Sequence, residues 1–308
     1  MIKKIVLALL FITTNILAQG DIKVFTVAND PKSDLPSVIE KTLEADGFYI
    51  SANSEMNGPF NIQFQQSDYD VFHLLTVFHL KLSDALVKKY PDAGIFVPMG
   101  IGIYQAKGDK SLHASVLTAE AQSKILGLKS VDPLLKSIEK EVTASLMKAM
   151  PKATVAISDE NPLPAEGPLV TRVEMEVDAD EWEDAKEELQ MTIEDGFKPM
   201  GFVMSNYTEY NYILTDEGKV ESPFDFYDTY SICKLKVIYN VAKTRPEASA
   251  FAPCTMMVYK KKGDDKIVMG FPGVYNWMSS ARVEDKDARA VLMKAQKDFE
   301  NILKNATE

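Results

Sequence analysis

The chain of 308 residues is poor in the residues on which most enzyme chemistry depends, with two cysteines, three histidines and two tryptophans. It contains no C-x-x-C or C-x-x-C-H pair, no H-E-x-x-H, no G-x-S-x-G and no Walker phosphate loop. These absences exclude the motifs of thioredoxin-like, haem-binding, zinc-protease, serine-hydrolase and P-loop proteins. Gly100-Ile101-Gly102 is a short piece of a dinucleotide fingerprint, but it falls inside a predicted strand, where close backbone packing explains it. We therefore assign no cofactor.

Clusters of positive charge are scarce as well. The chain has 34 Lys and Arg against 45 Asp and Glu, a net charge of −11 at pH 7. Its one basic run, Lys260-Lys261-Lys262, precedes Gly263-Asp264 in a predicted turn, where a solvated run is expected. Because nucleic acids and anionic membranes are bound by clustered Lys and Arg, we expect neither as a partner.

Long apolar runs are absent except at the start of the chain. Lys3 and Lys4 form a short basic start, and the apolar stretch from Ile5 to Ala18 ends on a small residue. A membrane span needs about 20 apolar residues, and this stretch has about 14. The pattern predicts a signal peptide over residues 1–18 with cleavage after Ala18, a retained anchor being the alternative. The mature chain is then periplasmic or secreted, with no membrane span.

The rest of the chain is globular in composition, 46% hydrophobic and 26% charged, and it repeats itself. Asp46-Gly47-Phe48 matches Asp195-Gly196-Phe197, and farther along the spacing grows to 155 residues, so the second copy carries six extra residues. The sequence predicts a tandem duplication, with a first domain at 19–150, a Pro-containing linker at 151–168 and a second domain at 169–308. The repeated motif residues are Phe96, Pro98, Tyr104 and Gly108 in the first copy and Phe251, Pro253, Tyr259 and Gly263 in the second.

Each copy has the pattern strand, helix, four strands, helix. A first helix is expected to end at Gly47 in the first copy and at Gly196 in the second, and the closing helices begin near Asp132 and Asp285. The pattern predicts an α+β fold of two repeated domains, each a small, mainly antiparallel sheet with helices on one face. In the first copy the strands are expected at 22–27, 48–52, 70–78, 95–104 and 111–116, with a short helix at 83–89.

A family resemblance is carried by the stretch from Leu86 to Gly108, in which Gly94-Ile-Phe-Val-Pro98 leads into a strand that ends at Tyr104. The second copy repeats this step as Ala250-Phe-Ala-Pro253-Cys254. Both stretches resemble the family called domain of unknown function 302, whose core is a helix, a Gly-x-x-x-Pro-Cys step and such a strand. The resemblance implies an antiparallel sheet with helices on one face that pairs as a dimer. A tandem chain supplies that dimer internally, as a pseudo-dimer within a monomer, and the family brings no settled activity.

The two cysteines, Cys233 and Cys254, belong to a chain expected in an oxidising compartment. If the strand that Cys233 closes and the strand that Cys254 opens are antiparallel neighbours, both thiols lie at one end of the sheet and a disulfide is possible. If the strands are parallel, the thiols cannot meet. Two buried, inert thiols are the other alternative. The first copy has Phe78 and Met99 at these positions.

Aromatic residues gather in the second copy and suggest a recognition surface. Packing between sheet and helices, and between the two copies, is the alternative. The candidate binding surface consists of Tyr227, Tyr230, Phe271, Tyr275 and Trp277.

The three histidines, His73, His79 and His113, fall on predicted strands. At about 3.3 Å per residue, His73 and His79 are roughly 20 Å apart, too far for one ion, so we assign no metal site.

Two classes of function remain. The first is an exported, soluble, non-catalytic binding or interaction protein, whose partner is a small molecule or a protein of unknown identity. The second is a thiol-based redox or accessory enzyme that uses Cys254, which needs a nearby base or cofactor that the sequence does not show. The lack of a catalytic constellation favours the first class.

Overall fold

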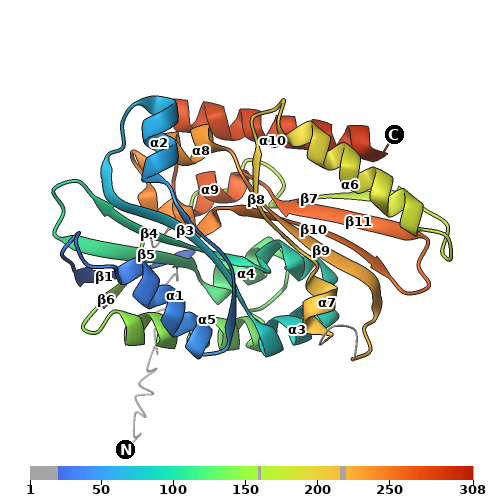
Figure 1. Ribbon diagram of the computed structural model, residues 1–308, viewed down its shortest axis with the longest axis horizontal. Helices are drawn as coiled ribbons and strands as arrows, with labels where there is room; N and C mark the ends of the chain where they lie inside the picture. Colours follow the sequence, from blue (N-terminus) through green and yellow to red (C-terminus); the bar gives the residue numbers. More distant parts are fainter. Residues whose placement is uncertain (1–19, 159–160, 216–219, 308) are drawn as a thin grey trace, which may run out of the picture.

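The computed structural model describes residues 20–158, 161–215 and 220–307. The predicted signal peptide at 1–18 lies outside these residues. The described chain forms two units, each an antiparallel sheet with helices, and the units lie against each other (Figure 1). The fold is α+β, as the sequence predicts.

The first unit extends from β1 to β6. In chain order its elements are β1 (Ile22–Ala28), α1 (Leu35–Ala45), β2 (Phe48–Glu55), α2 (Asn57–Phe64), β3 (Tyr69–His79), α3 (Leu80–Lys89), the 3-10 helix η1 (Pro91–Phe96), β4 (Met99–Ala106), β5 (Ser111–Leu117), α4 (Ala119–Ile125), α5 (Pro133–Ala149) and β6 (Thr154–Ile157).

The second unit repeats this order of elements. They are β7 (Val170–Glu176), α6 (Glu183–Phe197), β8 (Val203–Thr208), α7 (Tyr210–Leu214), β9 (Phe224–Cys233), α8 (Leu235–Ala242), the 3-10 helix η2 (Pro246–Phe251), β10 (Cys254–Lys261), β11 (Lys266–Pro272), α9 (Tyr275–Ser280) and α10 (Lys286–Thr307).

The two sheets also share one strand order. The first sheet is β2-β3-β4-β5-β1, with β6 added beyond β1, and the second is β8-β9-β10-β11-β7. All pairs of neighbouring strands are antiparallel. The predicted pattern of strand, helix, four strands and helix is therefore present in both units. The short helices α2, α4, α7 and α9 were not predicted.

Each sheet buries one face under its own helices and the other against the other unit. Helices α1 and α5 lie on the outer side of the first sheet, and α6 and α10 on the outer side of the second (Figure 1). In β3, Leu75 and Val77 belong to the core beneath the helices, while Phe72 and Leu74 belong to a core that both units share. A strand with both faces buried has few polar positions, and β3 is apolar from Val71 to Phe78 except at His73 and Thr76.

The units contact each other through equivalent elements. Helix η1 of the first unit packs on β10, and η2 of the second packs on β4 and β5. A Cβ atom on Gly94 of η1 would lie 2.0 Å from the hydroxyl of Tyr227, and one on Gly102 would lie 1.8 Å from Oγ of Ser249 in η2. Glycine at these two positions lets each 3-10 helix approach the opposite sheet.

The repeated motif residues occupy matching places in the two units. Phe96 and Phe251 end the two 3-10 helices, and Tyr104 and Tyr259 are buried on the fourth strands. The carbonyl oxygen of Pro98 accepts a hydrogen bond from Thr255 of the other unit at 2.8 Å, and Pro253 stands at the matching position before β10. The glycines of the two hairpin turns have positive φ, 84° at Gly108 and 77° at Gly263. That left-handed conformation explains the glycine.

The predicted match of Asp46-Gly47-Phe48 with Asp195-Gly196-Phe197 is wrong. Helix α6 continues through Gly196 and ends at Phe197. A Cβ atom at Gly196 would lie 2.9 Å from Ile302 of α10, so glycine is needed here for the two helices to pack closely. The true counterpart is Gly201-Phe202, with φ of 74° at Gly201 against 91° at Gly47. Both β2 and β8 then carry a bulge at the same distance from this turn.

Two further predicted boundaries differ. The strand expected at 95–104 begins only at Met99, because residues Pro91–Phe96 form η1. Residues Thr154–Ile157 of the predicted linker form β6, which pairs with β1 at the edge of the first sheet. A segment of four residues such as Thr154-Val-Ala-Ile157 is too short to give a periodic signal, so the sequence could not separate an edge strand from a linker.

Candidate functional site

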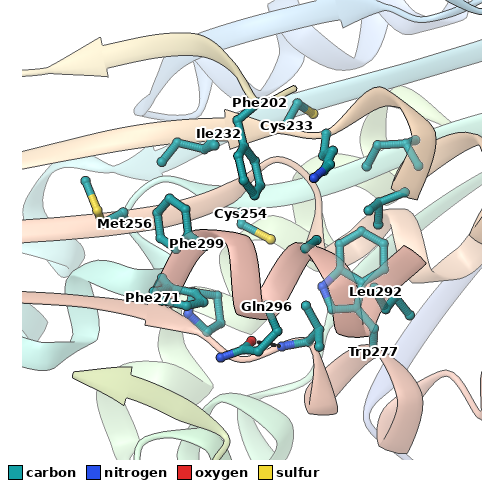
Figure 2. Close-up of a pocket in the computed structure, with 16 residues that line it drawn as sticks. Phe202, Ile232, Cys233, Cys254, Met256, Phe271, Trp277, Leu292, Gln296 and Phe299 are labelled. Atoms are coloured by element: carbon teal, nitrogen blue, oxygen red, sulfur yellow. Dashed lines mark hydrogen bonds between the residues drawn. The ribbon is translucent and has the colours of Figure 1, made fainter. Parts of the chain in front are cut away.

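An apolar pocket in the second unit is the best-defined candidate site. It lies between the second sheet and helices α8, α9 and α10 and encloses about 50 Å³, several times the ~10–15 Å³ that one water molecule needs. Most of its lining residues are apolar. Those labelled in Figure 2 are Phe202, Ile232, Cys233, Cys254, Met256, Phe271, Trp277, Leu292, Gln296 and Phe299.

The pocket wall combines strand ends with one helix face. Cys254 opens β10, and Met256 follows two residues later on the same face of the sheet. Phe271 comes from β11, and Leu292 and Phe299 of α10 recur two turns apart, which turns both toward the sheet. Segments distant in sequence therefore form one site.

One of the lining residues, Cys254, is smaller than its counterpart in the first unit. Met99 pairs with Val77 across β4 and β3, and Cys254 pairs with Ile232 across β10 and β9, so Met99 and Cys254 occupy the same register position. Met99 is buried in the core beneath the helices of the first unit. Cys254 is shorter than methionine and leaves space at the same place.

Both thiols lie at one end of the second sheet. Strands β9 and β10 are antiparallel, so the first of the two strand alternatives holds for Cys233 and Cys254, and both are free thiols in the structure. Desolvation by the apolar surroundings raises the pKa of each thiol to about 12, and contact with Trp277 offsets only part of this for Cys254. Because the thiolate is the nucleophilic form, neither thiol is activated near neutral pH.

One ion-pair cluster lies at the edge of the pocket. Lys234 lines the pocket, and its Nζ donates to Asp298 at 2.6 Å while lying 4.6 Å from the centre of the Phe202 ring. Lys294 donates to the same carboxylate at 2.8 Å. Burial by itself raises the pKa of Asp298, but the hydrogen bonds from the two lysines outweigh it and hold the pKa below its ordinary value. Asp298 therefore binds the ammonium groups of two lysines at once.

Two polar side chains complete the wall, and they differ in whether they form hydrogen bonds. Gln296 accepts a hydrogen bond from the backbone N–H of Val274 at 3.0 Å and donates to Thr171 and Glu300. The indole N–H of Trp277, by contrast, makes no hydrogen bond with any residue that the structure describes. Trp277 is only 2% exposed.

The predicted aromatic surface is divided among several places. Tyr227 is buried between the units, where it stacks on another tyrosine, and Tyr230 is buried beneath the helices of the second unit. Tyr275 packs against the linker. Phe271 and Trp277 both line the pocket. The five side chains fill space between sheet and helices and between units, as the alternative interpretation had it, and do not form one exposed surface.

The sequence did not identify Phe202, Lys234, Leu292 and Phe299 as pocket residues. Their positions depend on how α10 and the turn before β8 pack on the sheet, which no local pattern encodes. One signal was present, because the comparison of the copies shows a small residue, Cys254, at a position where the other copy has a large one.

A buried charged cluster lies elsewhere in the second sheet. Asp228 of β9 is buried and binds Lys186 at 2.7 Å and Gln190 at 3.1 Å. Burial raises the pKa of Asp228, and the ion pair with Lys186 counteracts only part of this. His73 occupies the equivalent position of β3, binds Asn53 at 2.8 Å, and has its pKa lowered by burial. Both groups are satisfied by neighbours, which is the pattern of structural polar groups.

The histidines do not converge. Within residues 20–158, 161–215 and 220–307, no group of three or more His, Cys, Asp and Glu side chains is placed to hold a metal ion. His79 caps α3 by accepting from the backbone N–H of Leu82 at 3.4 Å, and His113 binds Asp109 at 3.0 Å.

A wider hollow of about 490 Å³ lies along the linker, beside α4 and α9. Its one buried charged group, Asp21, already pairs with Lys124 and accepts a hydrogen bond from Ser280. Prolines of the linker form much of its wall. The buried carboxylate of this hollow is therefore already paired.

No family model matches the chain, and no curated protein matches it. Among solved structures, the chain is similar to an uncharacterized conserved protein described as DUF302, domain of unknown function 302, from Bacillus stearothermophilus. The identity is 15%, the match covers 46% of this chain and 100% of the other, and the TM-score is 0.36. None of the described helices combines the length and apolar character needed to cross a membrane.

Proposed function

We propose that the chain is an exported, non-catalytic binding protein, built as an internal pseudo-dimer of two copies similar to domain of unknown function 302, whose second copy holds a small apolar molecule. The observation that carries this proposal is the pocket behind Cys254. Its walls are hydrophobic and aromatic, its polar groups are few, and it opens beside an ion-pair cluster, which are ordinary features of small-molecule sites.

The size of the pocket limits the ligand. At about 50 Å³ it is smaller than an engineered cavity of about 150 Å³ that binds benzene. We infer that it takes a small branched group or the end of a short chain. Each buried CH₂ of such a group contributes roughly 0.8 kcal/mol.

The alternative function, a thiol-based redox or accessory enzyme using Cys254, gains no support from the geometry. The pKa of the Cys254 thiol is raised to about 12 by its apolar surroundings. A reactive cysteine needs an electropositive neighbour such as a histidine or a helix N-terminus. The pocket wall includes one cation, Lys234, and Asp298 already binds it.

Xenon is a suitable probe for the proposed ligand site, because it is apolar and small enough for a pocket of this size. In a two-dimensional NMR titration, signals of pocket residues in the wild-type protein are expected to shift and saturate with xenon pressure. The variant Cys254→Met, which fills the pocket with the residue of the first unit, loses the response. The volume-conserving variant Met256→Leu is the matched control and keeps it. Equal responses in wild type and Cys254→Met would rule out this pocket.

The pseudo-dimer is tested by cutting the chain. A protease site inserted within residues 151–168 gives two fragments, which are expected to co-elute in gel filtration. The buried contacts of η1 with β10 and of η2 with β4 and β5 support this expectation. Fragments that separate at micromolar concentration contradict it.

Export is proposed from the sequence alone, and intact-mass measurement tests it. Protein recovered from the periplasm or the medium is expected to begin at Gln19. A mass that includes residues 1–18 contradicts the proposal.

A further inference from the structure

Trp277 points to a specific chemical property of the ligand. Its side chain is 2% exposed and its indole N–H has no hydrogen-bond partner among the residues that the structure describes. Figure 2 shows the ring nitrogen on the side of the indole that faces Cys254 and Gln296, toward the interior of the pocket. Buried donors in folded proteins are nearly always paired, so an orphaned one that faces a pocket needs an explanation.

The other polar groups of the wall cannot supply the missing acceptor. The side-chain oxygen of Gln296 accepts from the backbone of Val274. The sulfur of Cys254 lies near the indole N–H, and this interaction lowers the pKa of the thiol. It does not reach hydrogen-bond geometry, and a protonated thiol is a weak acceptor. Lys234 carries no acceptor at all. The acceptor for Trp277 must therefore come from outside the wall.

We propose that the ligand carries one neutral hydrogen-bond acceptor, a carbonyl or ether oxygen, which accepts from Nε1 of Trp277 while its apolar remainder fills the pocket. This inference rests on the proposed function and adds the ligand's chemistry to it. The oxygen fixes the orientation of the ligand, and the surrounding apolar side chains select against groups that bring further polar atoms.

The acceptor is neutral because the cation among the lining residues already binds a carboxylate, and Lys294, the second lysine on that carboxylate, is not one of the lining residues. Lys234 is the cation that lines the pocket, and Asp298 binds it at 2.6 Å. A carboxylate placed among Phe271, Leu292 and Phe299 would lose its hydration without gaining an ion pair, which is strongly unfavourable.

Three probes of equal size separate these contributions. In 2-butanone the acceptor is a ketone oxygen. In 2-methyl-1-butene a CH₂ group replaces that oxygen, and in propanoate a carboxylate oxygen replaces one methyl group. All three have an ethyl group that can enter the pocket, so differences in binding report on the polar end.

The readout is the indole N–H signal of Trp277 in a ¹H–¹⁵N spectrum. The chain has two tryptophans, so Trp182→Phe assigns the two signals. Trp182 stacks on Phe226 at 5.3 Å, outside the pocket, and serves as an internal control. Binding of 2-butanone is expected to move the Trp277 proton downfield and leave the Trp182 proton unchanged.

Affinities complete the test. We expect 2-butanone to bind about tenfold more tightly than 2-methyl-1-butene, the usual effect of one added hydrogen bond, and propanoate to bind more weakly than both. In Trp277→Phe the ketone loses its advantage over the alkene. Equal binding of ketone and alkene, with no downfield shift, would overturn the inference and leave the apolar site intact. Tighter binding of propanoate would overturn it in favour of an anion. If neither neutral probe binds, the proposed function itself fails.

Discussion

Cys254 occupies in the second sheet the position that Met99 occupies in the first. Both residues open the fourth strand of their unit. Met99 pairs with Val77 and Cys254 pairs with Ile232, each near the end of the third strand. Two units with the same strand order therefore carry side chains of different size at this core position. The pocket lies beside the shorter side chain, Cys254, in the second unit.

Substituting each residue by its counterpart should change the stability of the protein in opposite directions. Cys254→Met is expected to stabilise the protein by about 1 kcal/mol, since it buries more apolar surface in available space. Met99→Cys removes packing from a filled core and is expected to cost about 1–3 kcal/mol. Urea unfolding followed by circular dichroism measures both. A marked loss of stability in Cys254→Met would mean that the position has no room for methionine.

Gly94→Ala should disrupt the contact between the units. The added Cβ would lie 2.0 Å from the hydroxyl of Tyr227, and overpacking of this kind costs about 1–3 kcal/mol. The double variant Gly94→Ala, Tyr227→Phe removes the clashing oxygen and is expected to recover part of the loss. Gly58→Ala, in helix α2, is the control and should be neutral or slightly stabilising. Thermal unfolding that is identical for Gly94→Ala and Gly58→Ala contradicts the close contact.

Much of the fold could be predicted from the sequence, because strand and helix periods repeat in both copies. Asp132 caps α5 by accepting from the backbone N–H of Leu134, and Asp285 accepts from that of Ala288 at the start of α10, as such residues at helix starts usually do. The prediction that Gly196 ends a helix is wrong for a physical reason. A glycine can end a helix or let two helices pack closely, and only the position of Ile302 decides between these roles.

The candidate site was less predictable. Trp277 and Phe271 were named among aromatic candidates, but their neighbours come from α10 and from the turn before β8. The pairing of Cys254 with Ile232 shows which strand alternative holds, and that pairing is a tertiary fact. A pocket is set by the space that side chains leave unfilled, and sequence patterns report which faces are apolar and not how well they are filled.

The ion pair of Asp298 should make stability depend on acid pH. Its pKa is held below the ordinary value because the hydrogen bonds from Lys234 and Lys294 outweigh the effect of burial. The stabilisation is therefore fully present above about pH 4, the unfolded range of an aspartate, and is lost as pH falls through the lowered folded pKa.

Asp298→Asn tests this directly. The variant is expected to be less stable than the wild type at pH 7, and the difference should shrink as pH falls from about 5 to about 2.5. Thr143→Ala, in α5 of the first unit, is the control, because it removes a polar group without changing the charge. A gap between wild type and Asp298→Asn that stays constant over this range contradicts the role of the ion pair.

The thiols should react slowly in the folded protein. Because burial raises the pKa of Cys233 and Cys254 to about 12, iodoacetamide at pH 7.5 is expected to label neither within minutes, and both after denaturation without reductant. Mass spectrometry of labelled peptides gives the result. Rapid native labelling of Cys254 would favour the redox alternative. A mass lower by two hydrogens, with no label after denaturation, would show the disulfide.

The most direct measurement of the central claim is a crystal structure of the wild-type protein under xenon pressure. The account predicts an anomalous peak between Cys254, Trp277 and Phe299, and no peak at the equivalent place behind Met99. In Cys254→Met the peak should disappear. A wild-type crystal with no xenon in this pocket, or with equal peaks in both units, would contradict the claim that the second unit holds a binding site for a small apolar molecule.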